Sequence, residues 1–328
     1  MSLHLITTLP KLDGYTSTDK IQNMKNILTI ALLVFIAHSS FAQQDPHYTQ
    51  YMYNMSLMNP AYAGSKETLS TGILYRKQWV DIEDAPTTAT FFGHMPVGKN
   101  LGAGLSVSSD KIGPVDETNV YGDISYTLNL GGVHKLSFGM KTGITMHKVG
   151  LYDDIYNTLP DVNDPAFSEN TNNTYFNIGS GLFYHTDKYY LAFSIPNLLK
   201  SKHLDYNGNE YGSEFSHYFL TGGYVFDINE SLKLKPFFMM KSAFEAPTSV
   251  DASINMLYNE KIELGVTYRL EDSFGAMVNF AITPELRIGY AYDHIVSDLN
   301  VRTSASHEFI LLYDIRFGKK ISESPRFF

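Results

Sequence analysis

The sequence contains no cysteine, and this absence excludes several kinds of chemistry. None of the 328 residues can form a disulfide, a thiolate metal site, a cysteine nucleophile or the lipid anchor of a lipoprotein. Charged residues make up only 18% of the chain, against roughly 25% in soluble domains. The formal net charge is -9 and no basic block is present. Nucleic acid is therefore not expected as a partner.

Long hydrophobic runs are also scarce. The mean hydropathy is -0.16, whereas each membrane helix needs about 20 consecutive apolar residues. A bundle of membrane helices is therefore excluded. The chain is instead rich in Tyr (23), Phe (21) and Gly (24), which indicates a protein with few helices.

The one continuous apolar run, residues 27–36, lies between Lys25 and Ser40-Phe41-Ala42. About ten apolar residues are too few to span a bilayer but match a secretory signal, and Ser-Phe-Ala has the small-x-small form of a cleavage site. A buried helix is the alternative interpretation. We expect export from the cytoplasm, with cleavage after Ala42.

This interpretation divides the chain into five parts. Residues 1–23 are expected to be a mis-assigned or dispensable upstream extension, and residues 24–42 the signal peptide. Residues 43–66 are expected to be a periplasmic or plug segment, residues 67–317 the folded domain, and residues 318–328 a periplasmic tail.

Beyond Gly64 the sequence alternates between apolar and polar or small residues. The pattern is clearest over residues 262–270, 286–293 and 309–317. Successive side chains of a strand point to opposite faces, so each segment has one apolar face. We expect fourteen strands, at residues 68–80, 87–96, 100–109, 117–128, 133–147, 173–185, 188–197, 215–227, 231–242, 248–258, 261–270, 273–283, 285–293 and 304–317.

Strand length and loop order indicate the environment of this sheet. Most expected strands have about 9 to 13 residues, close to the roughly 9 to 11 that cross a bilayer at a tilt. Connections after odd-numbered strands include the long ones, at residues 113–116, 148–172, 198–214 and 294–303. Connections after even-numbered strands are all short. The sequence therefore predicts an all-β fold, an up-and-down antiparallel transmembrane β-barrel with long extracellular loops and short periplasmic turns.

The sequence shows no convergent catalytic set. Ser306-His307-Glu308 contains the residue types of a hydrolase triad, but adjacent strand residues point to opposite faces. The acidic and amide-rich loop over residues 153–174 could bind calcium, although a solvated loop is the simpler interpretation. Glycines between Gly98 and Gly104 resemble a phosphate loop without the following helix. We expect no enzyme, no cofactor and no metal site.

The lumen-facing positions carry charges of both signs. This mixture is expected of a hydrated or plugged lumen without strong ion selectivity. The expected inward charges are Lys141, Lys233, Lys235, Lys241, Glu263, Arg269, Arg287, Asp293, Glu308, Asp314 and Arg316.

The chain carries a series of short motifs in a fixed order. They are Gln44-Asp45-Pro46-His47-Tyr48-Thr49-Gln50-Tyr51-Met52, Asn59-Pro60-Ala61-Tyr62-Ala63-Gly64-Ser65, Arg76-Lys77-Gln78-Trp79, Ala85-Pro86-Thr87-Thr88, Asp110-Lys111-Ile112-Gly113-Pro114, Gly289-Tyr290-Ala291-Tyr292-Asp293 and Ser306-His307-Glu308. In this order and spacing they resemble the PorP/SprF family of the Bacteroidota type IX secretion and gliding machinery. The resemblance extends from about Gln43 to Phe317.

The resemblance implies an outer-membrane barrel, in contact with outer-membrane lipid, that serves protein secretion or surface display. Implied partners are a large secreted adhesin or its C-terminal signal domain, and periplasmic ring components of the system. A diffusion channel for small solutes is the alternative. Candidate contacts with cargo or machinery are Tyr51, Asn59, Pro60, Ala61, Gly64, Arg76, Gln78, Trp79, Ala85, Pro86, Asp110, Gly113, Ser306, His307 and Glu308.

Residues 43–65 are the segment whose position the sequence leaves open. Its apolar residues Tyr51, Tyr53 and Met55 favour burial, so we expect it to plug the barrel partly. An N-terminal strand packed on the periplasmic rim is the alternative. Arg76, Gln78 and Trp79 are expected at the outer rim, as part of a fixed turn or a docking surface.

Overall fold

The computed structural model describes residues 48–66, 68–150, 170–199, 202–206, 209–213, 216–243, 246–303 and 305–315. The expected signal peptide, its cleavage site and the C-terminal tail lie outside these residues. So do Arg316 and most of the acidic loop that we considered for calcium.

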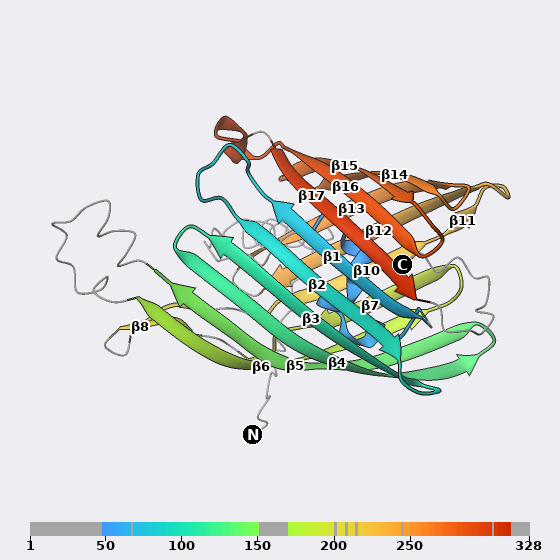
Figure 1. Ribbon diagram of the computed structural model, residues 1–328, viewed down its shortest axis with the longest axis horizontal. Helices are drawn as coiled ribbons and strands as arrows, with labels where there is room; N and C mark the ends of the chain where they lie inside the picture. Colours follow the sequence, from blue (N-terminus) through green and yellow to red (C-terminus); the bar gives the residue numbers. More distant parts are fainter. Residues whose placement is uncertain are drawn as a thin grey trace, which may run out of the picture. The chain divides into compact units, whose positions relative to one another are not determined.

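The wall of the molecule is one antiparallel sheet that closes on itself (Figure 1). The order of the strands in the sheet is β10-β7-β6-β5-β4-β3-β2-β1-β17-β16-β15-β14-β13-β12-β11. The sheet is closed because β10, at one end of this order, also pairs with β12. Because only Val225 separates β10 from β11, these two form one broken strand, and the barrel has fourteen strands as predicted. The strands are β1 (Leu69–Lys77), β2 (Thr87–Pro96), β3 (Leu101–Ile112), β4 (Val115–Gly131), β5 (His134–Val149), β6 (Thr171–His185), β7 (Tyr189–Ile195), β10 (Tyr218–Tyr224), β11 (Phe226–Asp227), β12 (Leu232–Ala243), β13 (Ala246–Tyr258), β14 (Ile262–Arg269), β15 (Ser273–Ala281), β16 (Leu286–Ile295) and β17 (Ala305–Ile315).

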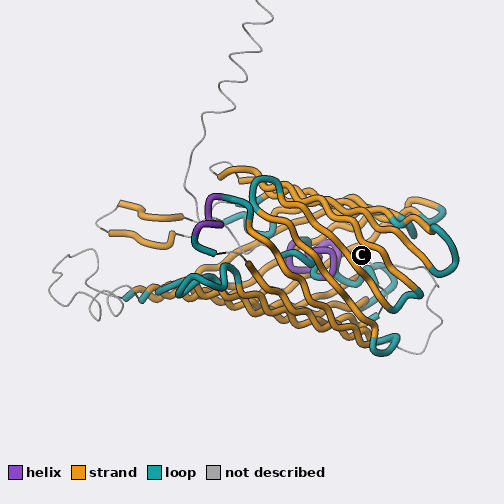
Figure 2. The backbone as a smooth tube through the Cα atoms, turned by 90° about the horizontal axis from the view of Figure 1, so that it is seen from above, coloured by secondary structure: helices purple, strands orange, loops and turns teal. Residues whose placement is uncertain are grey.

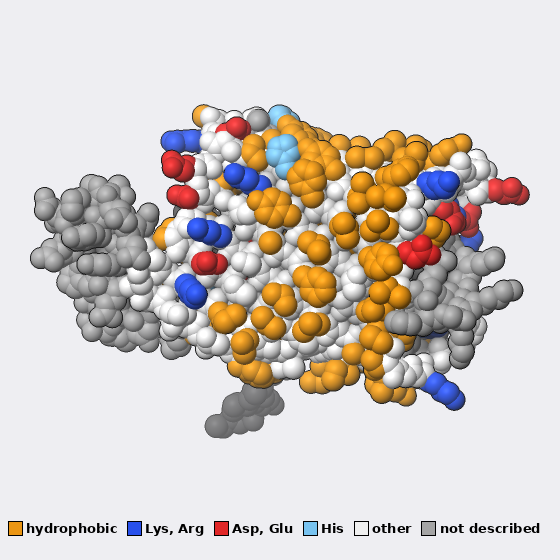
Figure 3. Space-filling model, in the orientation of Figure 1, with side chains coloured by type: hydrophobic (Ala, Val, Ile, Leu, Met, Phe, Trp, Pro, Cys, Tyr) orange, Lys and Arg blue, Asp and Glu red, His pale blue; other side chains and the backbone are white. Residues whose placement is uncertain are grey.

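The two faces of the wall are reversed relative to a soluble protein. Along β14 the apolar Leu264 and Val266 are 48% and 57% exposed, whereas Glu263 is fully buried. On the face that Figure 3 shows, hydrophobic side chains cover the middle and charged side chains gather at the two ends. Apolar residues therefore face outward and charged residues face the lumen, as a barrel in lipid requires.

The connections differ from the expectation at two places. The β3–β4 connection, expected to be long, is the two-residue turn Gly113–Pro114. Gly113 has a φ of 54°, which lets the chain reverse within two residues. Between β7 and β10, where we expected a loop, β8 (Lys202–Tyr206) and β9 (Asn209–Ser213) form a separate two-stranded sheet.

Residues 48–66, which we call the lumenal segment, lie inside the barrel. They form the short helices η1 (Tyr51–Tyr53), α2 (Met55–Met58) and η2 (Pro60–Tyr62) (Figure 2). Nearly every residue from Tyr48 to Ala63 is buried. The core of the molecule is therefore the contact between this segment and the inner wall.

Candidate functional site: the lumenal segment and the inner wall

The lumenal segment runs along the barrel from the long-loop half to the short-turn end. Near its start, the Tyr48 hydroxyl lies 3.4 Å from Thr90 Oγ1, in the long-loop half of β2. Near its end, the Gly64 N–H donates to His94 Nδ1 at 3.1 Å, close to the short-turn end of β2. The segment thus crosses the lumen before the chain enters β1.

A buried ionic cluster holds the first residues of this segment. Arg76, which is 2% exposed, donates from Nη2 to Asp293 Oδ2 at 2.7 Å and from Nη1 to Glu308 Oε2 at 3.1 Å. Arg76 Nη1 also donates to Thr49 Oγ1 at 3.0 Å. Glu308 accepts the backbone N–H groups of Thr49 and Gln50, both at 2.9 Å. β1, β16 and β17 thereby share one charge network with the segment.

A second buried ion pair lies further around the wall. Lys235 Nζ is 2.8 and 3.0 Å from the two carboxylate oxygens of Glu263, and Asn255 Nδ2 donates to the same carboxylate at 2.9 Å. Lys235 Nζ also lies 5.7 Å from the centre of the Tyr53 ring. Because charges this deep are costly unless paired, the pair fixes the surface against which Tyr53 packs.

On the other side, the wall formed by β3, β5 and β6 makes room for the segment with glycines. A Cβ added to Gly139 would lie 2.1 Å from the Ala61 nitrogen, and one added to Gly102 would lie 2.1 Å from the Ala63 oxygen. At Gly181 the added atom would lie 2.1 Å from Asn59 Oδ1. These distances are shorter than any real contact. The wall and the segment therefore meet backbone to backbone, which only glycine permits.

Asn59 and Pro60 position the last turn of the segment. The Asn59 side chain accepts the Ala61 N–H at 2.9 Å and caps η2. Its amide nitrogen also donates to the Leu182 carbonyl of β6 at 2.9 Å. Pro60 occupies the first position of the helix, where a missing N–H has no cost.

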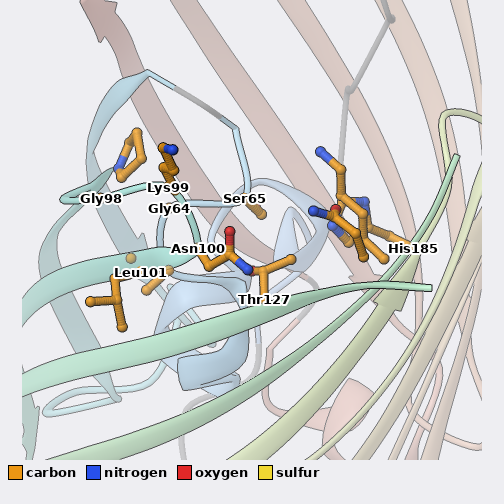
Figure 4. A pocket seen from close by; sticks show the side chains of 13 residues that line it. Gly64, Ser65, Gly98, Lys99, Asn100, Leu101, Thr127 and His185 are labelled. Carbon is orange, nitrogen blue, oxygen red and sulfur yellow. The ribbon is translucent and has the colours of Figure 1, made fainter. Parts of the chain in front are cut away.

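Two cavities lined by described residues lie beside the segment. The cavity in the long-loop half has a volume of about 110 Å³, with apolar Leu57, Met58, Phe219 and Met239 beside polar groups of β3 to β5. The cavity at the short-turn end has a volume of about 140 Å³ (Figure 4). Within the described ranges no three His, Asp or Glu side chains are placed to hold a metal ion, and no helix is long and apolar enough to cross a membrane.

Comparison with family models gives a match over residues 40–313, to the family described as Type IX secretion system membrane protein PorP/SprF. The chain belongs to this family. Sequence comparison with curated proteins finds no match. The family and the barrel together place the protein in the outer membrane.

Solved structures similar to this chain are outer-membrane barrels. The CymD monoaromatic hydrocarbon channel is 10% identical, with a TM-score of 0.52 over 86% of this chain and 95% of that chain. The P. putida toluene transporter TodX is 12% identical, with a TM-score of 0.48 over 86% and 96%. Omp33 from Acinetobacter baumannii is 10% identical, with a TM-score of 0.43 over 77% and 100%. At these identities the likeness shows a shared fold alone, and the match to CymD carries it.

The family motifs fall into two groups in the structure. Tyr51, Asn59, Pro60, Ala61 and Gly64 belong to the lumenal segment. Arg76 and Glu308 hold its first residues from the wall. We expected Arg76 at the outer rim, but the alternation of β1 turns its side chain into the lumen.

The second group lies at the long-loop rim. The Gln78 N–H donates to the Pro86 carbonyl at 2.9 Å, and Ala85 beside it is buried. The Trp79 N–H donates to Ser306 Oγ at 3.2 Å, which ties the β1–β2 connection to β17.

Three further motif residues, Gly113, Asp110 and His307, also lie near the long-loop rim. The Gly113 N–H donates to the Asp84 carbonyl at 2.9 Å. Asp110 accepts a hydrogen bond from Thr88. His307 Nδ1 lies 2.7 Å from the Tyr290 hydroxyl, on the face opposite to Ser306 and Glu308, so these three residues form no triad.

The partners of the wall charges could not be found from the sequence. Strand alternation places Glu263, Asp293 and Glu308 on the inner face, but it indicates no role for Thr49 or Gln50. The only available signal was that both residues stand in the first family motif.

A pair of introduced cysteines should lock the segment to the wall. The Ala63 Cβ lies 3.5 Å from the position of a Cβ on Gly104, within the roughly 3.5–4.5 Å of a disulfide. Because the chain has no other cysteine, we expect Ala63→Cys with Gly104→Cys to crosslink almost completely on mild oxidation. Mobility on non-reducing gels measures this. The control pair, Ala63→Cys with Gly122→Cys, should stay reduced, and crosslinking of both pairs alike would contradict the placement.

Gly139→Ala should displace the segment, because its Cβ would overlap the Ala61 backbone. We expect a loss of about 1–3 kcal/mol in the free energy of unfolding, measured by urea titration in lipid vesicles. Gly122→Ala is the matched control, since the nearest atom to its Cβ is 3.9 Å away. Equal stability of the two variants would show that the segment does not contact β5.

Proposed function

We propose that this protein is a plugged, non-enzymatic barrel of the type IX secretion system that docks or retains exported polypeptides at the cell surface. Its long loops face the outside and its short turns face the periplasm. Periplasmic components of the secretion machinery are the second class of partner. The signal peptide is removed after Ala42.

The occupied lumen carries this proposal. The lumenal segment crosses the barrel, is buried along most of its length, and is bound by Arg76 and Glu308 on one side and by a glycine-lined wall on the other. A diffusion channel needs a continuous water path, whereas here a buried segment runs through the lumen. Docking needs only an ordered outer rim.

The long-loop rim supplies a surface for a client. The Trp79 N–H donates to the Ser306 hydroxyl and so holds the β1–β2 connection to β17, and the Gly113 N–H donates to the Asp84 carbonyl and holds it to the β3–β4 turn. Beside it, the cavity of about 110 Å³ combines the apolar Phe219 and Met239 with Lys141 and Lys241. An apolar side chain of an exported polypeptide would fit the apolar part, and polar groups of the same polypeptide would meet the charged part.

Gene deletion tests the proposal directly. Cell-surface proteins of the deletion strain and of the strain with the gene restored are labelled with a membrane-impermeant reagent and compared. We expect one or a few large exported proteins to disappear from the surface while other outer-membrane proteins remain. An unchanged surface proteome, together with swelling of liposomes that contain the purified barrel in small sugars, would identify a diffusion channel instead.

A further inference from the structure

The outer wall of the barrel carries a row of basic residues at the long-loop end. Lys77 of β1 is the cross-strand partner of His307 of β17 on one side and of Thr87 of β2 on the other. Thr87 is in turn the partner of Lys111 of β3. Direct partners lie on the same face of a sheet, and both lysines are exposed. These side chains therefore all lie on the outward face, the face that meets the membrane.

The row continues along the wall from β3 to β5. Lys111 lies opposite Asp116 of β4, and Asp116 lies opposite Lys148 of β5. Neighbouring strands are about 4.8 Å apart, so the three lysines, on alternate strands, follow one another at roughly 10 Å along the wall. We call Lys77, Lys111 and Lys148 the lysine row. Figure 3 shows Lys and Arg side chains, with acidic ones among them, at this end of the wall beside the hydrophobic cover.

The lysine row differs from the other lysines of the barrel in its pairing. All three of its members are exposed and form no ion pair with any residue in the described part of the chain. Asp116, the acidic residue between Lys111 and Lys148, pairs with neither. Elsewhere a lysine nitrogen lies within 3.2 Å of a carboxylate oxygen, as at Lys141, Lys188, Lys233 and Lys235. Three positive charges against one negative charge therefore remain available to a ligand.

The two ends of the outward face differ in charge. Within β17 and β1 to β5, the outward positions in the short-turn half hold no Lys, Arg, Asp or Glu. Residues there include Tyr313, Leu69, Met95, Leu101, Leu128 and Leu136. Lysines that only bring their charge to a membrane surface would be equally useful at both surfaces. A row at one end alone indicates an anionic ligand in that leaflet.

The outward positions next to the row, toward the middle of the wall, carry small side chains. They are Ala89, Ser109 and Thr118, which are cross-strand neighbours on β2, β3 and β4. One position further, Phe91 and Val107 begin the apolar band. Small side chains stand out less from the wall than Tyr75, the cross-strand partner of Ala89. A headgroup therefore has room below the ammonium groups, and acyl chains can continue over the apolar band.

We propose that the lysine row binds the phosphate groups of an anionic membrane lipid, whose acyl chains lie on the apolar band below Ala89 and Ser109. Ammonium groups form charge-assisted hydrogen bonds to phosphate, and one lysine near a membrane surface strengthens the binding of an anionic lipid about fivefold. The row faces sideways into the membrane rather than into the lumen, which favours a lipid over a dissolved anion or an exported polypeptide.

The orientation in the proposed function, with the long loops outside, places this lipid in the outer leaflet. The binding itself does not depend on that function. A surface proteome that is unchanged by gene deletion would count against docking and would leave the lipid site standing.

Native mass spectrometry of the full-length protein in nonionic detergent counts bound lipids and tests the site. The probes are lipid A, a phosphorylated glycolipid, and the same lipid after chemical removal of its phosphates. We expect saturable binding of lipid A that weakens about 25-fold when Lys77→Gln and Lys111→Gln are combined, since each lysine contributes about fivefold. The dephosphorylated lipid should bind the wild-type protein no better than lipid A binds this double variant.

The matched control combines Lys188→Gln with Lys233→Gln, which removes the same charge from lysines that are already paired, with Asp227 and Glu260. It should leave the affinity for lipid A unchanged. Heat-dependent mobility on gels verifies that each variant is folded. The proposal is overturned if the wild-type protein binds both lipids equally or neither, or if the two double variants lose the same affinity. Displacement of lipid A by an equal concentration of inorganic phosphate would also overturn it, because the site would then hold a dissolved anion.

Discussion

Replacing Arg76 by methionine should lower the free energy of unfolding by about 3–5 kcal/mol, the cost of leaving a buried charge without its partner. Arg76 neutralises Asp293 and Glu308, which are 2% and 0% exposed. Methionine has a similar length but no charge, so both carboxylates would remain buried without the guanidinium that contacts them. Thr49 would also lose the guanidinium hydrogen bond.

Urea unfolding in lipid vesicles, followed by the fluorescence of the single tryptophan, Trp79, measures this loss. Lys233→Met is the control, since its pair with the exposed Glu260 is a surface contact of about 0–1 kcal/mol. The loss of stability for Arg76→Lys should lie between those of Arg76→Met and Lys233→Met. Lysine keeps the positive charge but cannot donate from two guanidinium nitrogens to Asp293 and Glu308 at once. A change below about 1 kcal/mol for Arg76→Met would show that the cluster does not hold the fold together.

The wall could be predicted from the sequence because its signal is local. In β14 and β17 every second residue is apolar, and lipid on one side with a polar lumen on the other enforces that alternation along the strand. The fourteen predicted strands all correspond to strands of the barrel. The barrel closes by pairing β1 with β17. An up-and-down barrel with an even number of strands has antiparallel first and last strands, so this pairing was expected.

The interior could not be predicted in the same way, because its contacts join distant parts of the chain. Glu308 binds the backbone of Thr49, 259 positions earlier, and no periodic pattern indicates this pair. The segment's short helices are also only three or four residues long, too short for an amphipathic pattern. Gly102 stood among the glycines between Gly98 and Gly104, but nothing in the sequence indicated that Gly102 and Gly139 meet the backbone of the lumenal segment.

The β3–β4 connection shows a related limit. The spacing indicated a loop at residues 113–116, yet the strands extend to Ile112 and begin again at Val115. Charged residues Lys111 and Asp116, which are paired across the two strands, resembled loop sequence. Where a strand extends beyond the lipid-facing apolar band, both of its faces meet water, and apolar and polar residues no longer need to alternate. The end of such a strand therefore cannot be located from the hydropathy pattern.

Removing the segment should convert a closed barrel into a conducting one. Barrels of about eight strands are filled by their own side chains, whereas those of 16 to 18 leave an aqueous channel. In this fourteen-stranded barrel a separate segment fills the interior, so its loss leaves a charged, hydrated lumen. No wall strand lies within residues 43–62, so we expect the deletion to keep the strand pairing of the barrel.

The oxidised Ala63→Cys, Gly104→Cys protein is the control for this experiment, because its segment cannot leave the lumen. Its conductance should equal that of the wild-type protein. If a crosslinked segment still allowed large currents, the current would pass around the segment rather than through its place.

Single-channel conductance in planar bilayers, compared between the wild-type protein and the deletion of residues 43–62, tests most directly whether the segment closes the barrel. We predict little or no current through the wild-type protein and discrete, larger steps for the deletion. Equal conductance of the two proteins would contradict the account.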